Sequence, residues 1–544
     1  MLDKVADQVA RGVHAWRAQS LTPLETPLFR WLWLAAMASN FGAVIQMIGA
    51  SWTMTTLDPS PHIVALVQTA ALLPIVIFAL PAGALADTAD RRILMLTSQI
   101  LGLIATIILI VFAYSGMMTP WLLLACTALV GAAMALHTPA WQASFADFVP
   151  RHALPAAVGL NSLAYNVARS LGPAFGGFII ALAGASATFV INAVSFIGLI
   201  AVLAMNKLPR TTVTLPPEPV GQAMIAGLRY TIMSPMLKAI FARSALFGFG
   251  GSTVWSLAPL IAQQRIGGGS IEYGILLGGF GAGSLVAATL SASVRAYFGN
   301  ERLFNLSTAA FAISTVFIGL STLMPVTLVF MTIAGAAWIF TFTTTTTCIQ
   351  FCSPRWVMGR AVALSQVSVV GSIAMGAAFW GFIAEHSSLL VAFACGGAFL
   401  ALSLLMTFFA PLPGREFEDL SPHPAADVPA PALKVEGATG PVFITIEYEV
   451  PRDQIDDFLA TMYAIGRIRK RDGARRWGIQ QDIDNPNIWV ERIESATWTD
   501  HLRRANRATV ADQAVRRKAE TFRLKGTGGI RRTVERPQGS TPLD

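Results

Sequence analysis

Charged residues are scarce in this chain. Aspartate, glutamate, lysine and arginine together make up 13% of its 544 residues, whereas a soluble domain of ordinary composition has about 25%. Hydrophobic residues make up 54% and are gathered into long runs. Because roughly 20 apolar residues in a helix cross the hydrocarbon core of a bilayer, the composition excludes a string of soluble domains. It predicts an integral membrane protein with the lipid bilayer as a partner.

Cysteine is scarce as well. The four cysteines all lie in apolar segments, so the sequence contains no disulfide framework. Cys348 and Cys352 are spaced i, i+4, but two thiols are too few for a metal site, and we expect apolar packing of both. The sequence also lacks the glycine-rich loop with lysine and serine or threonine that holds the phosphates of ATP. We therefore predict no metal, no cofactor and no ATP-driven pump.

The net charge of +8 could indicate nucleic-acid binding. The basic residues, however, lie in short loops between apolar runs and in the tail, so we expect no nucleic-acid partner. Residues 1–30 lack the compact apolar core of a cleavable signal peptide. In residues 1–20 apolar residues recur at helical spacing with basic ones between them, which is typical of an amphipathic helix on a membrane surface. A frayed tail is the alternative.

Twelve apolar segments are long enough to span a bilayer. Six fall within residues 21–206 and six within residues 236–410, and a polar, proline-rich loop at 207–235 separates the two groups. This arrangement predicts an all-α membrane protein made of two six-helix bundles. The predicted spans are 31–57, 63–86, 93–114, 120–146, 155–182, 186–206, 236–262, 271–298, 302–322, 326–350, 361–385 and 388–410.

Lysine and arginine residues are concentrated in every second loop between the predicted spans. Arg265 is the one clear basic residue in the loops that would lie outside if the N-terminus lay inside. Since basic residues favour cytoplasmic loops, both termini and the 207–235 loop are predicted to be cytoplasmic. The inner loops of this arrangement hold Arg91, Arg92, Arg151, Lys207, Arg210, Arg302, Arg355 and Arg360.

The two halves of the apolar region resemble each other. Three short motifs of the first half recur in the second half at one common offset of about 204 residues. Repeats of this kind are typical of secondary transporters, whose substrate site lies between the repeats near the middle of the bilayer. The pairs are Gly131-Ala-Ala and Gly335-Ala-Ala, Pro150-Arg151 and Pro354-Arg355, and Phe175-Gly-Gly-Phe-Ile and Phe379-Trp-Gly-Phe-Ile.

The composition changes after Ala410. Residues 411–440 are rich in proline and alanine and are predicted to be a linker, and residues 536–544 a disordered tail. Between them, 441–535 alternate strand-like and helix-like patterns. Strands are expected at 442–450, 477–482 and 488–493, and helices at 452–470 and 496–520. We predict a small cytoplasmic α+β domain of ferredoxin-like type.

The loop after the second span resembles the signature loop of the major facilitator superfamily. It reads Gly83-Ala-Leu-Ala-Asp87-Thr-Ala-Asp-Arg91-Arg92, with Thr88 and Asp90 where the family usually has a basic residue and a glycine. The resemblance implies a latch at the cytoplasmic ends of the helices, in which an aspartate pairs with basic residues. The expected latch residues are Gly83, Asp87, Arg91, Arg92, Asp147 and Arg151.

The fifth span carries small residues and a proline at the spacing of the antiporter signature of that superfamily, with Ala168 in place of one glycine. Small residues let two helices approach closely, and a proline bends a helix. In the family this signature marks exporters; generic small-residue packing is the alternative. The residues are Gly159, Gly172, Pro173, Gly176 and Gly177.

Arg169 lies in the middle of the same span. A charge inside a membrane is costly and is by default a functional candidate. It could hold an anionic substrate, or it could bond backbone carbonyls beside Pro173. His137 is the candidate proton carrier, with a buried structural histidine as the alternative. Further polar or aromatic residues lie on helices that line the cavity in the superfamily, and about half are expected only to bridge helices. The cavity candidates are Asn40, Gln46, His137, Asn161, Asn166, Arg169, Trp255, Thr345, Gln350 and Gln366.

Thr138-Pro-Ala-Trp-Gln142, Asn166-Val-Ala-Arg169 and Gly172-Pro173 together resemble the enterobactin-exporter-like subgroup, also called transmembrane secretion effectors. The resemblance implies proton-coupled export of a siderophore or drug-like solute across a bacterial inner membrane. The segment from Arg471 to Trp477 and the segment Trp498-Thr-Asp-His501 resemble the dimeric α+β barrel of antibiotic-biosynthesis monooxygenases. That resemblance implies self-association. We predict no catalytic residues and no enzyme activity; a tail that senses or modifies the cargo is the alternative.

Overall fold

The structure of the chain is a computed structural model that describes residues 22–144, 148–149, 153–206, 220–414, 419–420, 431–433, 435–523 and 530–536. The amphipathic helix expected at 1–20 lies outside them. The chain divides into two compact units. The first comprises residues 1–220, 241–345 and 365–411, and the second comprises residues 221–240, 346–364 and 412–544.

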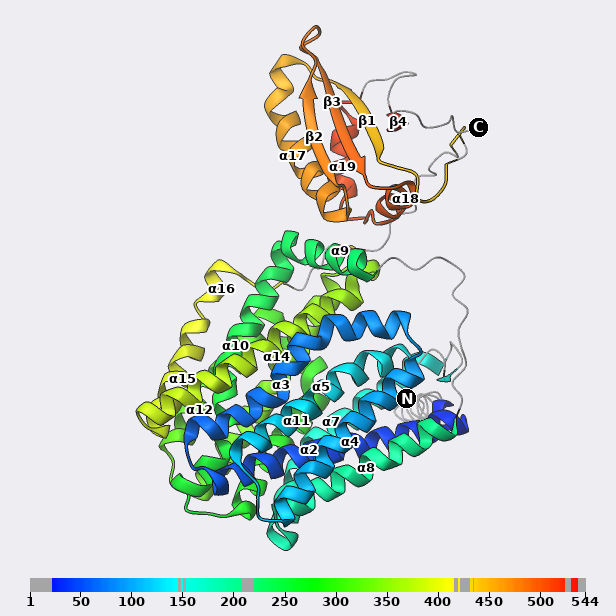
Figure 1. Ribbon diagram of the computed structural model, residues 1–544. Coiled ribbons are helices and arrows are strands. Elements are labelled where there is room, and N and C mark those ends of the chain that lie inside the picture. The colour runs from blue at the N-terminus through cyan, green and yellow to red at the C-terminus, as the bar shows by residue number, and fades with distance from the viewer. Residues whose placement is uncertain are drawn as a thin grey trace, which may run out of the picture. The chain divides into compact units, whose positions relative to one another are not determined.

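The expectation of twelve membrane-spanning helices is confirmed within the described ranges, where twelve helices are long and apolar enough to cross a bilayer (Figure 1). A short 3-10 turn, Thr22–Glu25, precedes them. The first six are α2 (Pro27–Leu57), α3 (Pro61–Thr88), α4 (Arg91–Tyr114), α5 (Pro120–Ala143), α7 (Leu154–Ala183) and α8 (Ala185–Met205). The second six are α10 (Pro235–Leu260), α11 (Ser270–Phe298), α12 (Asn300–Leu320), α13 (Met324–Phe351), α14 (Arg355–His386) and α15 (Leu389–Ser403), followed by α16 (Met406–Phe409).

Local chemistry sets where these helices begin. Proline occupies the first turn of α2, α3 and α5, where its missing N–H costs no hydrogen bond. Ser60 and Thr119 cap α3 and α5 by accepting hydrogen bonds from backbone N–H groups. Asp90, which departs from the family pattern, caps α4 through the N–H groups of Arg92 and Ile93. The capping role gives this departure a local structural reason.

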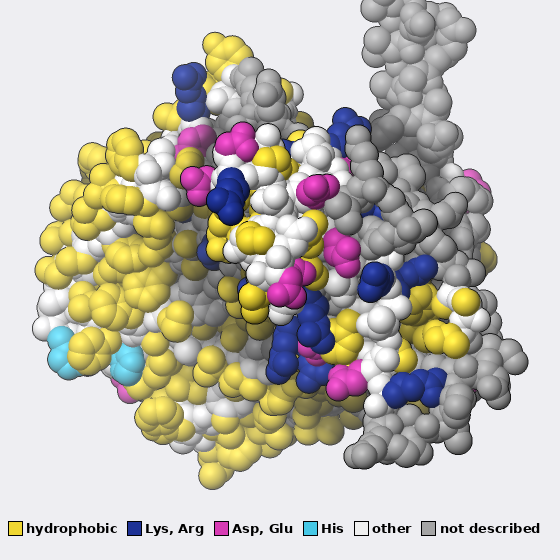
Figure 2. All heavy atoms as spheres, turned by 90° about the horizontal axis from the view of Figure 1, so that it is seen from above, with side chains coloured by type: hydrophobic (Ala, Val, Ile, Leu, Met, Phe, Trp, Pro, Cys, Tyr) yellow, Lys and Arg dark blue, Asp and Glu magenta, His cyan; other side chains and the backbone are white. Residues whose placement is uncertain are grey.

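The first unit has two ends, a basic end and a far end. The basic end is the end where α3 stops and α4 begins, beside Arg91 and Arg92. The far end is the end where α2 stops and α3 begins. Large apolar side chains such as Ile77, Val111 and Phe178 are exposed on the helix flanks between the two ends. Such a surface is expected against acyl chains, and Figure 2 shows hydrophobic side chains covering much of one side of the molecule in that view.

Each half of the first unit has its own packing. In the N-terminal half α3 packs on α5, while α2 packs on α7 and α8. In the C-terminal half α12 packs on α15, and a buried ion pair lies where these helices approach α10. Arg243 of α10 is 2% exposed and donates from Nη1 to both carboxylate oxygens of Glu301 at 2.8 Å. Asn305 and Thr407 accept further hydrogen bonds from the same guanidinium.

The loop expected at 207–235 contains a helix that the sequence analysis did not predict. This helix, α9, spans Val220–Met233, and residues 207–219 lie outside the described ranges. A five-residue π-helical turn, Ile261–Arg265, also extends α10 beyond its predicted end. It follows Pro259, whose lack of an N–H interrupts the regular helical ladder.

The C-terminal domain confirms the expected α+β class. Its four strands form one antiparallel sheet in the order β2-β3-β1-β4, and its helices cover one face of that sheet. The fourth strand, β4 (Ile530–Val534), was not predicted. The elements are β1 (Val442–Glu449), a 3-10 turn (Arg452–Gln454), α17 (Ile455–Asp472), β2 (Arg476–Gln481), β3 (Ile488–Ser495), α18 (Trp498–Asn506), α19 (Gln513–Glu520) and β4.

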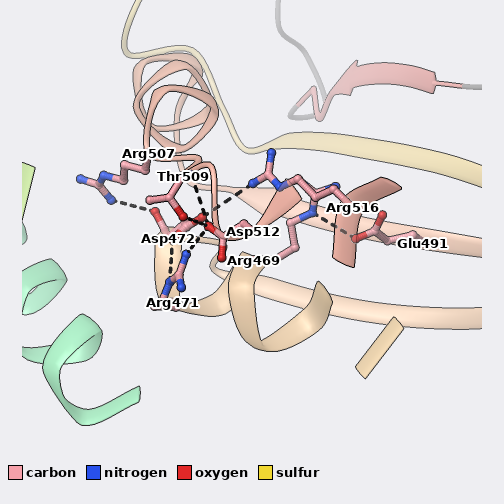
Figure 3. Close-up of polar contacts among 8 residues, drawn as sticks. All are labelled: Arg469, Arg471, Asp472, Glu491, Arg507, Thr509, Asp512 and Arg516. Carbon is pink, nitrogen blue, oxygen red and sulfur yellow. Dashed lines mark hydrogen bonds and ion pairs between the residues drawn. The ribbon is translucent and has the colours of Figure 1, made fainter. Parts of the chain in front are cut away.

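A buried carboxylate sits in the apolar core of this domain. Glu491 on β3 is fully buried and accepts hydrogen bonds from Tyr448 Oη at 2.9 Å and Trp477 Nε1 at 2.8 Å. Arg469 at the end of α17 completes the set at 3.3 Å (Figure 3). Around it pack Ile444, Ile446, Phe458, Met462, Ile465 and Ile493.

Candidate functional site

The two halves of the first unit meet along α7 and α11. A Cβ placed on Gly177 would lie 2.3 Å from the Cα of Gly274, so the two backbones touch near the far end. Further along the same two helices, a Cβ on Gly281 would lie 2.0 Å from the carbonyl oxygen of Ser170. Close backbone approach at small residues is how helices gain packing energy inside a membrane.

The remaining glycines of the fifth-span motif divide into two groups. Gly172 and Gly176 face α2, where an added Cβ would lie 2.8 Å from Val44 and 3.1 Å from Ile48. Gly159 has no atom within 4 Å of such a Cβ. The motif therefore carries contacts on two sides of α7 between Gly172 and Gly177, while Gly159 makes no close contact in this conformation.

A second set of contacts joins the halves at the far end. Ser60 Oγ donates to Glu385 Oε2 at 2.8 Å, which connects the start of α3 to the end of α14. Further along the same pair of helices, Thr69 Oγ1 donates to the carbonyl oxygen of Ala374 at 2.8 Å. The Trp52 ring also stacks on the buried ring of Tyr273, with centroids 5.7 Å apart. The far end is therefore closed by side chains from both halves.

Arg169 lies at the junction of the halves, beyond this closed region. Its guanidinium donates from Nη1 to Tyr165 Oη at 3.0 Å and lies 5.8 Å from the ring centroid of Trp255. Within the described ranges no carboxylate lies within 4 Å of it. Arg169 and Trp255 line a cavity of about 30 Å³ together with Ser170, Phe280, Ser284 and Trp338.

The cavity lining combines the cation of Arg169 with a hydrogen-bond donor of Trp255. Trp255 Nε1 is buried and has no hydrogen-bond partner among the described residues. A volume of this size holds about one water molecule, so a solute could bind only where the helices separate. The lining offers aromatic faces, a guanidinium and hydroxyl groups, which suit a flat or amphipathic solute with a negative or hydrogen-bond-accepting group.

Several cavity candidates serve instead in contacts between helices. Gln46 accepts hydrogen bonds from Thr106 Oγ1 at 3.1 Å and Asn192 Nδ2 at 2.6 Å, inside the N-terminal half. Asn161 accepts from Trp141 Nε1 at 3.0 Å. Through these hydrogen bonds Gln46 joins α2 to α4 and α8, and Asn161 joins α7 to α5.

The other candidates are scattered. His137 stacks on Trp141 with ring centroids 5.9 Å apart, and its buried Nδ1 has no partner in the described part of the chain. Thr345 accepts a hydrogen bond from Ser244 Oγ at 3.3 Å. Asn40 is half-buried, Gln350 and Gln366 are exposed, and the side chain of Asn166 is outside the described set.

The expected latch is only partly within the described structure. The side chains of Asp87, Asp147 and Arg151 lie outside it. Arg92 donates to the carbonyl oxygens of Leu203 and Ala204 at 2.8 and 2.7 Å, so it closes the C-terminal end of α8. A Cβ on Gly83 would have no atom within 4 Å, and Arg91 Nε donates to the carbonyl oxygen of Ala86 at 3.3 Å.

A family model described as transmembrane secretion effector matches residues 18–538. The chain belongs to this family. Curated relatives include the staphyloferrin A transporter of Staphylococcus aureus, 29% identical over 50% of this chain and 69% of that protein. The macrolide efflux protein A of Streptococcus pyogenes is 22% identical over 55% of this chain and 73% of its own length. The multidrug efflux pump Tap of Mycobacterium bovis is 28% identical over 38% and 50%.

Solved structures agree on the fold. A bacterial homolog of the human lysosomal transporter Spinster, inward-facing and unoccupied, matches with a TM-score of 0.54, covering 72% of this chain and 96% of that one at 16% identity. A POT family transporter in complex with 5-aminolevulinic acid gives 0.57, covering 70% and 96% at 11% identity. This transmembrane secretion effector therefore has the expected major facilitator fold.

The contact between α7 and α11 yields a direct prediction. Gly177→Val places a side chain where the backbone of Gly274 lies, so the far end should open and transport should fall at least about tenfold, as expected for over-packing that costs about 1–3 kcal/mol. Opening is measured as faster labelling of a Ser51→Cys reporter by a maleimide that does not cross membranes, in a variant without the native cysteines. Gly159→Val, on the same helix with open space around it, is the control. Equal labelling in both variants would contradict the assignment.

Proposed function

We propose that this transmembrane secretion effector exports a small amphipathic solute, a siderophore or drug-like compound, from the cytoplasm by alternating access. The single observation that carries the proposal is the position of Arg169. Its guanidinium lies at the junction of the two halves, against the Trp255 ring and in contact with Tyr165, with no carboxylate partner among the described residues. The family and its siderophore and drug efflux relatives support the direction of transport.

The orientation follows from the loops. Basic residues gather at the basic end, and loops rich in basic residues face the cytoplasm. We therefore place the basic end and both termini on the cytoplasmic side of a bacterial membrane. In this orientation the contacts Ser60–Glu385 and Gly177–Gly274 close the outer side. The conformation would then be one in which cargo reaches Arg169 from the cytoplasm, and export requires the far-end contacts to separate.

Arg169 is proposed to bind the cargo through a negative or strongly accepting group. Guanidinium binds carboxylates through paired N–H donors, and such charge-assisted bonds are stronger than neutral ones. The Trp255 ring beside it adds an aromatic face, and its unpaired Nε1 adds one donor. The antiporter-signature residues Gly172, Pro173, Gly176 and Gly177 would shape the same helix for the rocking of one half against the other.

Replacing Arg169 tests this site. Arg169→Gln should reduce transport of an anionic siderophore by roughly ten- to a hundredfold in inside-out vesicles, as expected for loss of a charged hydrogen bond of about 1.5–3 kcal/mol. Tyr165→Phe removes the partner hydroxyl but leaves the cation, so its transport should stay near that of the unchanged protein. Normal transport by a membrane-inserted Arg169→Gln variant would refute the proposed role.

Coupling to protons is proposed on the family resemblance, with His137 as carrier. Its ring stacks on Trp141 and its buried Nδ1 has no partner among the described residues, so proton binding there would disturb a ring contact within α5, against the tryptophan that donates to Asn161 of α7. The latch residues and the remaining polar candidates, Asn40, Thr345, Gln350 and Gln366, would act in later steps of the cycle.

An imposed pH gradient tests coupling. Acidifying the lumen of inside-out vesicles should accelerate solute uptake several-fold, because each proton leaving the lumen would drive one solute in. His137→Gln should lose this acceleration, whereas His62→Gln, a histidine at the far end beside Phe382, should keep it. Uptake that ignores the gradient in the unchanged protein would rule out proton antiport.

The C-terminal domain is proposed to serve in association or in sensing the cargo rather than in catalysis. Its helices cover one face of the sheet, and the other face carries half-buried Phe443, Thr445 and Val490. We propose this face as the contact with a second copy. Among the described residues no group of three or more histidine, cysteine, aspartate or glutamate side chains could hold a metal.

A further inference from the structure

Buried carboxylates in the C-terminal domain are paired with arginines. Glu491 pairs with Arg469, and Asp472 accepts a hydrogen bond from Arg471 Nε at 3.0 Å. Asp512 accepts from the same guanidinium at 2.7 Å. Figure 3 shows the Asp472 and Asp512 pairs joined through Arg471 at the end of α17, with the separate Glu491–Arg469 pair beside them. Pairing of this kind is expected, because a buried charge without a partner is strongly destabilising.

Arg504 does not follow this pattern. It lies on α18, is 5% exposed, and within the described structure has no carboxylate within 4 Å. Its Nη2 donates to His501 Nδ1 at 3.1 Å, and its Nε has no hydrogen-bond partner there. A guanidinium is never an acceptor and retains its charge in proteins, so Arg504 is a buried cation with a donor to spare.

His501 has a donor to spare as well. Because Nδ1 accepts from the guanidinium, the neutral ring carries its proton on Nε2. That nitrogen is buried and has no partner among the described residues. Burial, followed by the positive charges of Arg504, Arg532 and Arg469, lowers the pKa of His501 to about 4. The ring is therefore neutral at physiological pH, in agreement with the hydrogen bond that it accepts.

A third donor lies at the end of β3. Ser495 is fully buried, and its Oγ has no hydrogen-bond partner in the described ranges. By the alternation of the strand it faces the same side of the sheet as Glu491 and Ile493, the side that the helices cover. The chain then turns directly into α18, which carries His501 and Arg504.

The electrostatics of this region favour an anion. Burial, followed by the positive charge of Arg469, lowers the pKa of Arg504 to about 9, although the carboxylates of Glu491 and Asp472 oppose this shift. His501 Nε2 and Ser495 Oγ lack acceptors, and the charge of Arg504 is buried. An added group with negative charge and several acceptor atoms would satisfy all three. A carboxylate or a phosphate meets it, because the guanidinium fork matches the geometry of both.

We propose that α18 and the end of β3 form a binding site for a small oxyanion, held by Arg504, His501 and Ser495. The site is separate from the cargo site at Arg169 and does not depend on the proposed transport function. It would make the C-terminal domain of this transporter a receptor for an anionic metabolite.

Equilibrium dialysis of the full-length protein in detergent tests the site, with labelled inorganic phosphate and labelled succinate as separate probes at constant ionic strength. One saturable site per chain is expected for one or both probes in an Arg169→Gln background, which removes the other candidate cation. Arg504→Gln should weaken binding at least about tenfold, and His501→Phe should weaken it less. Arg503→Gln is the matched control, since the neighbouring Arg503 is 27% exposed and pairs with Asp500.

Folding of each variant is checked by limited proteolysis of the C-terminal domain. If Arg504→Gln proves to be unfolded, Arg504→Lys serves in its place, because it keeps the charge but loses the Nε donor and should still bind more weakly. Binding of only one probe identifies the anion class and supports the proposal. Absence of saturable binding for both probes, equal binding by the folded Arg504 and Arg503 variants, or equal competition by chloride would overturn it.

Discussion

The backbone contact between α7 and α11 is the constraint on which the rest of the transport unit depends. Inside a bilayer no hydrophobic force draws two helices together, so their contact depends on close packing at small residues. Gly177 and Gly274 supply that contact near the far end, and Gly281 against Ser170 continues it toward the middle. Arg169 directly precedes Ser170. The position of the cation relative to Trp255 and Trp338 therefore follows from how closely these two helices approach.

Three buried or half-buried arginines differ in the partners of their guanidinium groups. Arg243 is paired with the carboxylate of Glu301 and also donates to Asn305 and Thr407, so it joins three helices within one half. Among the described residues, Arg169 and Arg504 have no carboxylate within 4 Å; Arg169 contacts a hydroxyl and aromatic rings, and Arg504 contacts a neutral imidazole. A carboxylate within the chain balances the charge of a buried arginine, whereas an arginine without one can bind an anion from outside the chain. This difference separates the structural arginine from the two that we assign to binding.

The sequence predicted those elements that follow from hydropathy and from the spacing of apolar residues along the chain. The twelve spans and the first three strands were recognised because apolar runs and alternation reflect burial directly. α9 was missed because residues 207–235 were interpreted together as one proline-rich loop, although residues 220–233 are largely apolar. β4 was missed because Arg531 and Arg532 interrupt its apolar pattern at the edge of the sheet. Edge strands tolerate such charges.

The site was predicted only in part. The motif on the fifth span led to Arg169 and to the glycines beside it, but Gly274, Phe280 and Ser284 belong to no motif and became visible only through packing. Gln46 and Asn161 show the opposite case. Their polarity marked them as cavity residues, yet they bond to neighbouring helices, because composition does not determine which side of a helix faces the cavity.

The transport cycle proposed for this protein requires that the closed far end open for export. A reversible cross-link across the far end tests this requirement. Ser60→Cys with Glu385→Cys replaces the two side chains that are in contact at 2.8 Å, in a variant without the native cysteines. A short bifunctional methanethiosulfonate reagent, which spans the gap left by the shorter cysteine side chain, should join the two thiols and stop transport. Reduction should restore transport, and the reagent should not change transport by either single variant. Full transport by the cross-linked protein would contradict this requirement.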